Sequence, residues 1–251
     1  DSLNNGGKKT LAGAAYAKIK ADVTGGVFAP GQRLRIEDLR QAYGTGASPL
    51  REALSRLAAE GIVVSIGQRG FRVPPVSVEE LRDITSMRIL LETEALRQSI
   101  EHGDDEWEAE VVASFHRLTK AEIGEGADFP EWEQLNKRFH DALLAACPSR
   151  WLLRFYETMY DQHRRYRALS VQATNSPRDV HAEHERIKDA ALARDVDRAC
   201  AESVIHIRRT AEIDEQLLSA KQVAGQPTTD ATHEPSGLRR RDRPPPSRAG
   251  R

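Results

Sequence analysis

Arginine and small polar side chains gather between residues 33 and 70, and together they could bind a nucleic acid. The guanidinium of Arg51 can reach a guanine edge or a phosphate, and it follows Ser48 and Pro49, which are typical of a helix start. A helix N-terminus itself attracts phosphate. Phosphate contacts would set the register, whereas base contacts would give specificity. The residues predicted at this interface are Arg33, Arg35, Ser48, Pro49, Arg51, Ser55, Gln68, Arg69 and Gly70.

Three short helices and a small wing must position these side chains. The apolar periodicity predicts helices from about Leu11 to Val23 and from Ile36 to Tyr43, and a third that Ser48 caps and Gly61 ends. Two strands at residues 62–66 and 70–73 would form the wing, joined by residues 67–69. This order is typical of a winged helix-turn-helix, in which the third helix enters the major groove.

The rest of the chain is predicted to be helical. Helical stretches are expected near residues 77–101, 104–123, 129–147, 149–173 and 177–218, the last with a break at Arg194-Asp195, where Asp195 or Asp197 could cap a new helix. The predicted fold class is therefore mostly α. A winged helix-turn-helix with a β-hairpin wing occupies residues 8–76 and an all-α effector bundle residues 77–220. Residues 226–251, rich in Pro and Arg, are predicted to be a disordered basic tail.

Charge divides the chain in the same way. Residues 8–76 hold 11 Lys and Arg against 5 Asp and Glu, whereas residues 77–225 hold 20 against 29. A basic unit beside an acidic body indicates that only the first meets phosphates. No apolar run approaches the ~18 residues of a membrane span. The two cysteines, Cys147 and Cys200, lack metal or redox spacing, which favours buried free thiols in a reducing cytoplasm.

Three sequence pieces resemble the GntR family of bacterial transcription regulators. They are Pro30-Gly31-x-x-Leu34, the run Pro49-Leu50-Arg51-Glu52-Ala53-Leu54-x-x-Leu57-x-x-Glu60-Gly61, and Arg69-Gly70-Phe71-x-Val73. The resemblance implies a protein that binds double-stranded operator DNA. Ala47 departs from the family, which often carries a base-contacting arginine there, so the usual operator sequence does not carry over.

The helical body resembles the FCD effector domain of the FadR-type branch over about residues 78–215. The matching pieces are Arg88-Ile89-Leu90-Leu91-Glu92, Asn136-Lys137-Arg138-Phe139-His140, His184-Glu185-Arg186-Ile187 and His206. Within this branch, the chain resembles most the carbon-starvation-induced regulators, through segments such as Gly103-Asp104-Asp105-Glu106-Trp107-Glu108-Ala109. The resemblance implies a small carboxylate effector, such as the short dicarboxylates glutarate and 2-hydroxyglutarate.

The resemblance also implies a divalent metal held by Asn136, His140, His184 and His206. Asn136 and His140 are four residues apart and share one helical face. His184 lies on an inward apolar stripe. Three imidazoles and one oxygen suit zinc or nickel. The alternative is that these histidines are hydrogen-bonded core residues, and Asn136, where many relatives carry Asp, would bind a metal more weakly.

Arg88 is the first candidate for an effector carboxylate clamp, since a guanidinium binds a carboxylate with two parallel bonds. Arg165, Tyr166 and Arg167 are a second group, and Tyr166 is favoured because it continues an inward helical stripe formed by Leu152, Tyr156, Met159 and His163. The alternative pairs Arg88 with Glu92 on the helix surface. We therefore expect a ligand-responsive regulator, a repressor by default and a homodimer, and not an enzyme. Two alternatives stay open: a metal-dependent enzyme, and a constitutive DNA binder without an effector.

Overall fold

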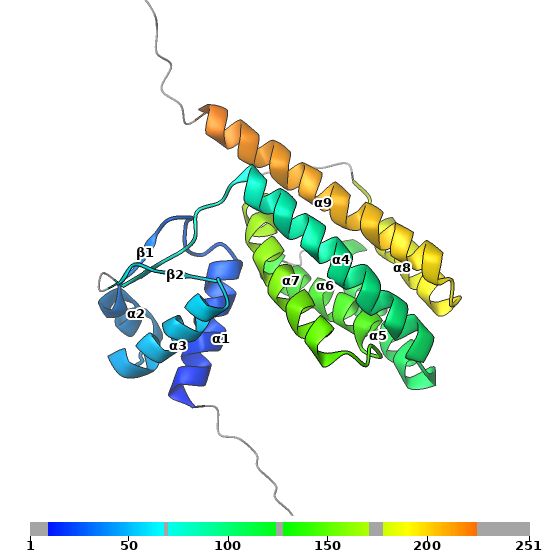
Figure 1. Cartoon of the computed structure of the whole chain (residues 1–251), viewed down its shortest axis with the longest axis horizontal. Coiled ribbons are helices and arrows are strands. Elements are labelled where there is room, and N and C mark those ends of the chain that lie inside the picture. The colour runs from blue at the N-terminus through cyan, green and yellow to red at the C-terminus, as the bar shows by residue number, and fades with distance from the viewer. Residues whose placement is uncertain (1–9, 68–69, 124–127, 171–177, 225–251) are drawn as a thin grey trace, which may run out of the picture.

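Two bodies make up the chain in the computed structural model, which describes residues 10–67, 70–123, 128–170 and 178–224. The first body contains helices α1–α3 with a small sheet, and the second contains helices α4–α9 (Figure 1). A short extended segment before α4 connects them. The predicted tail at residues 226–251 lies outside the described residues.

The first body is a three-helix unit with a three-stranded sheet. Its elements are α1 (Leu11–Thr24), β1 (Arg33–Leu34), α2 (Ile36–Tyr43), α3 (Ala47–Ala59), β2 (Val64–Ser65) and β3 (Phe71–Arg72). The sheet is antiparallel in the order β1-β3-β2. We predicted only the β2–β3 hairpin, because a two-residue strand such as β1 is too short to show an alternating pattern. Apolar residues from all three helices and the sheet form one core, with Leu50, Leu54 and Leu57 of α3 at 0 % exposure.

Helix α3 starts earlier than predicted, so the assignment of Ser48 as its cap is wrong. The helix begins at Ala47, and the cap is Gly46, which has no side chain to accept a hydrogen bond. Pro49 is the third helical residue. This position tolerates proline, because the first backbone N–H groups of a helix have no carbonyl partner to lose.

The second body is an all-helical bundle. Its helices are α4 (Val78–His102), α5 (Asp105–Ile123), α6 (Phe129–Leu144), α7 (Arg150–Ser170), α8 (Val180–Leu192) and α9 (Val196–Ala224). The predicted break between the last two is confirmed: Arg194 adopts φ +57°, and Asp195 Oδ1 accepts a hydrogen bond from Arg198 N at 3.1 Å. Together the two bodies confirm the predicted fold class, a winged helix-turn-helix followed by a helical bundle.

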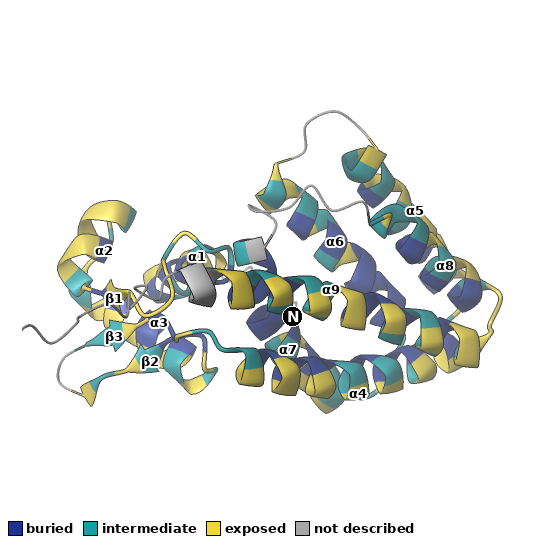
Figure 2. Cartoon of the chain, turned by 90° about the horizontal axis from the view of Figure 1, so that it is seen from above, coloured by how far each residue is buried: buried dark blue, intermediate teal, exposed yellow. Residues whose placement is uncertain are grey.

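The helices of the bundle turn their buried faces toward one another (Figure 2). Apolar residues of α4–α9, among them Phe139, Leu143 and Ile187, form its main core. Many polar side chains are buried beside that core, including histidines, arginines and carboxylates. Cys147 is a buried free thiol, as predicted, whereas Cys200 is a free thiol that is only partly buried. Within the described ranges, no helix combines the length and apolarity needed to cross a membrane.

Candidate functional site

Four exposed arginines mark one candidate surface on the first body. Arg33 on β1 lies directly opposite Arg72 on β3, and Arg35 follows at the cap of α2. Arg51 is exposed on α3, as are Ser48 and Ser55. Among the described residues, none of these four guanidiniums forms an ion pair or a side-chain hydrogen bond. Like charges opposite each other destabilise a sheet, so an anion bound there would relieve the repulsion. Sequence reasoning missed Arg72, because nothing in the sequence showed that β1 would pair with β3.

The start of α3 adds a second anion-binding feature. Because Gly46 caps the helix without a side chain, the first backbone N–H groups have no capping partner from it. Gly44 adopts φ +61° in the turn before α3, a conformation that glycine reaches easily. Pro49 is partly buried. At the wing, Gly70 has φ +98°, while Gln68 and Arg69 lie outside the described residues.

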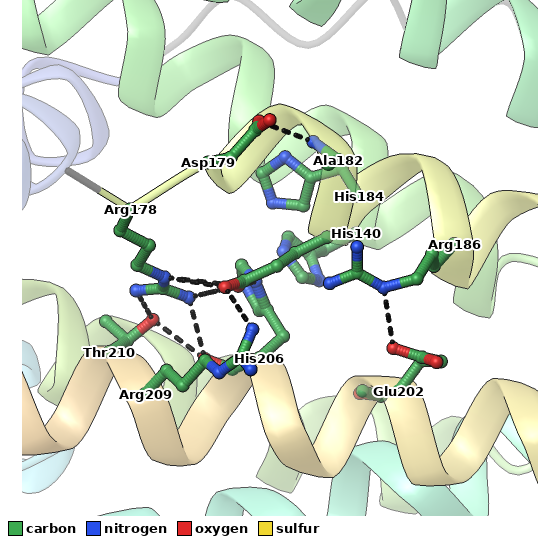
Figure 3. A network of polar contacts seen from close by, with 12 residues as sticks. His140, Arg178, Asp179, Ala182, His184, Arg186, Glu202, His206, Arg209 and Thr210 are labelled. Atoms are coloured by element: carbon green, nitrogen blue, oxygen red, sulfur yellow. Dashed lines mark hydrogen bonds and ion pairs between the residues drawn. The ribbon is translucent and has the colours of Figure 1, made fainter.

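Three predicted histidines meet in the interior of the second body. His140 on α6, His184 on α8 and His206 on α9 are all buried, and one ring nitrogen from each lies within 4.8 Å of the others. The rings of His184 and His206 are 4.7 Å apart between centroids. Figure 3 shows the three imidazoles converging between the helices.

Each of the three histidines has a carboxylate at its Nδ1 atom. The partners are Glu92 for His140 at 3.1 Å, Glu122 for His184 at 2.8 Å and Glu183 for His206 at 2.9 Å. If each Nδ1 donates to its carboxylate, each Nε2 keeps its lone pair. Within the described part of the chain, Nε2 of His140 and Nε2 of His184 are buried and have no hydrogen-bond partner. A buried polar atom without a partner is costly, and a divalent metal is a partner that such nitrogens accept.

Electrostatics favour the neutral, metal-binding form of His140 and His206. Burial lowers the pKa of His140 to about 4, against the opposing effect of Glu92. Burial likewise holds the pKa of His206 well below its usual value. Burial raises the pKa of Glu92, but Arg88 and His140 together hold that pKa below its ordinary range. The imidazoles of His140 and His206 are therefore neutral near pH 7 and the Glu92 carboxylate is charged, as histidine ligation requires.

Contacts with arginines hold Glu183, the carboxylate beside His206. Arg178 Nε donates to Glu183 Oε1 at 3.0 Å, and Arg209 Nη1 donates to the same atom at 3.0 Å. Arg178 also reaches Thr210 Oγ1 at 2.9 Å, so it joins the start of α8 to α9 (Figure 3). This arrangement fixes the carboxylate that orients His206.

Asn136, the predicted fourth ligand, lies one turn before His140 on α6. Its Nδ2 donates to Tyr160 Oη at 2.9 Å. Its Oδ1 is buried and has no hydrogen-bond partner among the described residues. The amide oxygen of Asn136 is therefore buried without a hydrogen-bond partner in the described part of the chain, like Nε2 of His140 and Nε2 of His184.

Two buried arginines border this group of residues. Arg88 is 1 % exposed and donates from Nε to Glu92 Oε2 at 2.9 Å. The alternative reading of Arg88 thus named the right partner, but the pair is buried and not on the helix surface. Arg167 donates to both oxygens of Glu133. The guanidinium carbons of Arg88 and Arg167 each lie 4.8 Å from the ring centroid of Tyr160.

Arg165 and Tyr166 lie away from the histidines, at the junction between the two bodies. Arg165 Nη2 donates to the carbonyls of Pro74 at 3.1 Å and Pro75 at 3.2 Å. Tyr166 is buried against Leu81, and its hydroxyl bonds to Glu80. The helical stripe predicted correctly that Tyr166 is buried, but it could not show which neighbour the residue meets.

Sequence reasoning also missed His163, which joins the two arginines. Its Nδ1 lies 2.7 Å from Arg88 Nη1 and 3.3 Å from Arg167 Nη1. The inward stripe of α7 contained this histidine, and that was the available signal. Glu122 and Glu183 carried no such signal, since their roles depend on how α5, α8 and α9 pack.

Comparisons with known proteins agree with both bodies. Residues 11–73 match the family described as bacterial regulatory proteins, gntR family, and residues 83–209 match the FCD domain. The chain is 42% identical over 213 residues to an uncharacterized HTH-type transcriptional regulator, BphR of Paraburkholderia xenovorans, covering 83% of this chain and 87% of BphR. It is 38% identical over 190 residues to the HTH-type transcriptional repressor GlaR of Escherichia coli, covering 73% and 86%.

The chain belongs to the GntR family and carries an FCD domain. It is a DNA-binding transcription regulator and not an enzyme. The fold of E. coli McbR/YncC is similar, with a TM-score of 0.75 and 22% identity, covering 83% of this chain and 99% of that one. Family membership accounts for the winged unit, which a metal-dependent enzyme would leave unexplained.

Proposed function

We propose that this GntR-family regulator is a repressor that a small carboxylate releases from its operator. Residues 8–76 would bind the DNA, and residues 77–220 would bind a divalent metal and the effector. The observation that carries the proposal is the convergence of three buried imidazoles whose Nδ1 atoms already meet carboxylates. The similarity to GlaR, which is described as a repressor, supports repression as the mode of action.

The metal would be held by His140, His184, His206 and the amide oxygen of Asn136. Three nitrogens and one oxygen fit zinc or nickel. A bound ion would supply a buried positive charge with coordination positions open to an anion. The orphaned Nε2 atoms of His140 and His184 and the orphaned Oδ1 of Asn136 support this assignment over a purely structural role for the histidines.

Arg88 and Arg167 would favour an anionic effector. Both guanidiniums are buried beside the histidine group, and each guanidinium carbon lies 4.8 Å from the ring centroid of Tyr160. Each already pairs with a glutamate, Glu92 and Glu133 respectively. An effector carboxylate would therefore share these cations with protein carboxylates, and its binding would shift helices α4 and α7. Arg165 and Tyr166 would contribute through the junction between the bodies and not by direct contact.

A homodimer in the bacterial cytoplasm, where its operator DNA lies, is part of the proposal. Two-fold proteins bind two half-sites of a near-palindromic operator. Helices α4 and α7 pack against each other, and both expose large apolar side chains. Met87 and Leu90 on α4 are 40 % and 61 % exposed, and Trp151 and Phe155 on α7 are 65 % and 55 % exposed. These residues support a surface that a second copy covers.

A gel shift on the DNA upstream of the chain's own gene tests this proposal. The protein, loaded with Zn²⁺, should shift the fragment, and glutarate or 2-hydroxyglutarate should weaken the complex. Glutaramide, which has the same carbon chain without charge, serves as the control. A fragment that shifts equally with every carboxylate and with the amide would contradict effector control and leave a constitutive DNA binder.

A further inference from the structure

Helix α7 touches the buried site with one face and the DNA-binding body with the other. Tyr160, His163 and Arg167 point inward, where they contact Asn136, Arg88 and Glu133. The spacing of three and four residues places them on one side of the helix. Asp161, Gln162 and Arg165, offset by one or two positions, lie on the opposite side.

The outward residues of α7 contact both α1 and the end of α3. Asp161 Oδ2 forms an ion pair with Lys20 Nζ of α1 at 2.7 Å. Gln162 Nε2 donates to the backbone carbonyl of Glu60 at 3.3 Å. Because Glu60 is the C-terminal cap of α3, Gln162 holds the end of the helix whose other end carries Ser48 and Arg51.

Inside the first body, the partners of Asp161 and Gln162 also contact each other, through Lys20, Glu60 and Tyr16. Tyr16 Oη donates to Glu60 Oε2 at 2.6 Å, and Lys20 Nζ lies 3.5 Å from the same oxygen. The side chain of Asp161 is only 9% exposed, so water screens its ion pair with Lys20 weakly. Helices α1, α3 and α7 therefore meet at one polar junction.

Arg165 makes that junction stiffer. Its Nη1 donates to Gln162 Oε1 at 2.7 Å, which orients the amide toward Glu60. Its Nη2 holds the carbonyls of Pro74 and Pro75 in the connecting segment. Nearby, a Cβ atom built on Gly26 would lie 3.2 Å from Ala168 Cβ. The two bodies are thus in close contact, and a displaced α7 has little room to move without moving the first body.

We propose that α7 transmits occupancy of the buried site to the DNA-reading helix, and that Asp161 and Gln162 are the positioning residues of that transmission. This inference rests on the proposed function of the site. A helix behaves as a rigid rod over such short lengths, so a rotation that repositions Tyr160, His163 or Arg167 also displaces Asp161 and Gln162. Occupancy then changes the orientation of α3, and with it the affinity for DNA, to the extent that it favours one of two arrangements.

The test uses the full-length protein with Zn²⁺ alone as the probe of the buried site. Three properties are measured with and without the ion: Zn²⁺ affinity by calorimetry, hydrogen exchange of residues 47–61, and affinity for the DNA upstream of its own gene. The test variants are Asp161→Asn and Gln162→Ala. The matched control is Glu157→Gln, an exposed carboxylate one turn earlier on α7.

In the wild type and in Glu157→Gln, Zn²⁺ should change DNA affinity by about fivefold or more, the lower end of ordinary allosteric coupling. In Asp161→Asn and Gln162→Ala, Zn²⁺ affinity should persist, while the changes in DNA affinity and in exchange of residues 47–61 should largely vanish. A Zn²⁺ response that is as large in both variants as in the wild type would overturn the proposal. So would Zn²⁺ binding to the wild type without either change.

A second perturbation separates failure of this inference from failure of the proposed site. Tyr160→Phe removes the hydroxyl that contacts Asn136 and Glu133 on the inner face of α7, and it requires no metal. Its expected effect is altered exchange of residues 47–61, absent when Gln162→Ala is combined with it. If Zn²⁺ binds no variant but Tyr160→Phe has this effect, the metal site fails and the connection through α7 stands. Unchanged exchange in Tyr160→Phe would contradict the connection itself.

Discussion

Replacing His184 with alanine should abolish the stabilisation of the protein by Zn²⁺. The substitution removes one of three ring nitrogens that lie within 4.8 Å of one another, and leaves only two imidazoles and the weakly binding neutral amide of Asn136 to hold the ion. At a free ion concentration of one hundred times the wild-type Kd, binding should add about 2.7 kcal/mol to the free energy of unfolding. For a body of this size that corresponds to a rise in Tm of about 5–11 °C, at 2–4 °C per kcal/mol.

The carboxylate behind His184 supplies a graded version of the same test. Glu122→Gln keeps the shape of the side chain but removes the charge at His184 Nδ1. Loss of such a partner weakens metal binding by about 10–100-fold. At the same ion concentration, the stabilisation should therefore fall from about 2.7 kcal/mol to between about 0.4 and 1.4 kcal/mol.

His181 provides the matched control. Its Nδ1 lies 3.1 Å from Glu122 Oε2, yet it does not belong to the three-histidine group. Thermal unfolding of His181→Ala should retain the full Zn²⁺ shift, whereas His184→Ala should show none. Equal shifts in these two variants would refute the assignment of the site, as would a wild type that neither Zn²⁺ nor Ni²⁺ stabilises.

Three further expectations follow from other parts of the molecule. Arg72→Ala should reduce the slope of log affinity for DNA against log salt by about one, measured by fluorescence anisotropy, since it removes one phosphate contact; an unchanged slope would remove Arg72 from the interface. Phe155→Glu should convert a dimer to a monomer in light scattering, whereas Val112→Glu, at an exposed apolar position on α5, should not; a dimer in both would place the dimer contact elsewhere. Leu54→Ala should cost about 2–5 kcal/mol of unfolding free energy in denaturant titrations, because the residue is fully buried. Leu11→Ala, at a position 69 % exposed, should stay near wild type.

The fold was largely predictable because its signals are local. Nearly every helix was predicted within a few residues of its observed bounds. The signals were glycines and prolines at the ends of helices, apolar stripes, and a capping aspartate at residue 195. The start of α3 was misplaced because Ser-Pro is a strong start signal, yet a helix can begin before it when the proline falls in the first turn. Strand β1 was missed because its only support is the non-local pairing of Arg33 with Arg72.

The histidine group was predictable from the resemblance and from helical spacing, but its surroundings were not. The carboxylates Glu92, Glu122 and Glu183 come from three different helices, and only tertiary packing brings them to the imidazoles. The same limit explains why Arg167, and not Tyr166, faces the buried site. Position along a helical stripe shows that a residue is buried, but it does not identify the neighbour it meets.

Binding of duplex DNA through the exposed face of α3 is the central claim, and one substitution tests it most directly. Affinity of the full-length protein for the DNA upstream of its own gene is measured for the wild type, Arg51→Ala and Arg40→Ala. Arg40 lies on α2 and pairs with Glu37, so its loss should leave affinity nearly unchanged. Loss of Arg51 should weaken binding by about 5–150-fold, the equivalent of 1–3 kcal/mol. If Arg51→Ala binds this DNA as tightly as the wild type does, α3 is not the helix that reads it.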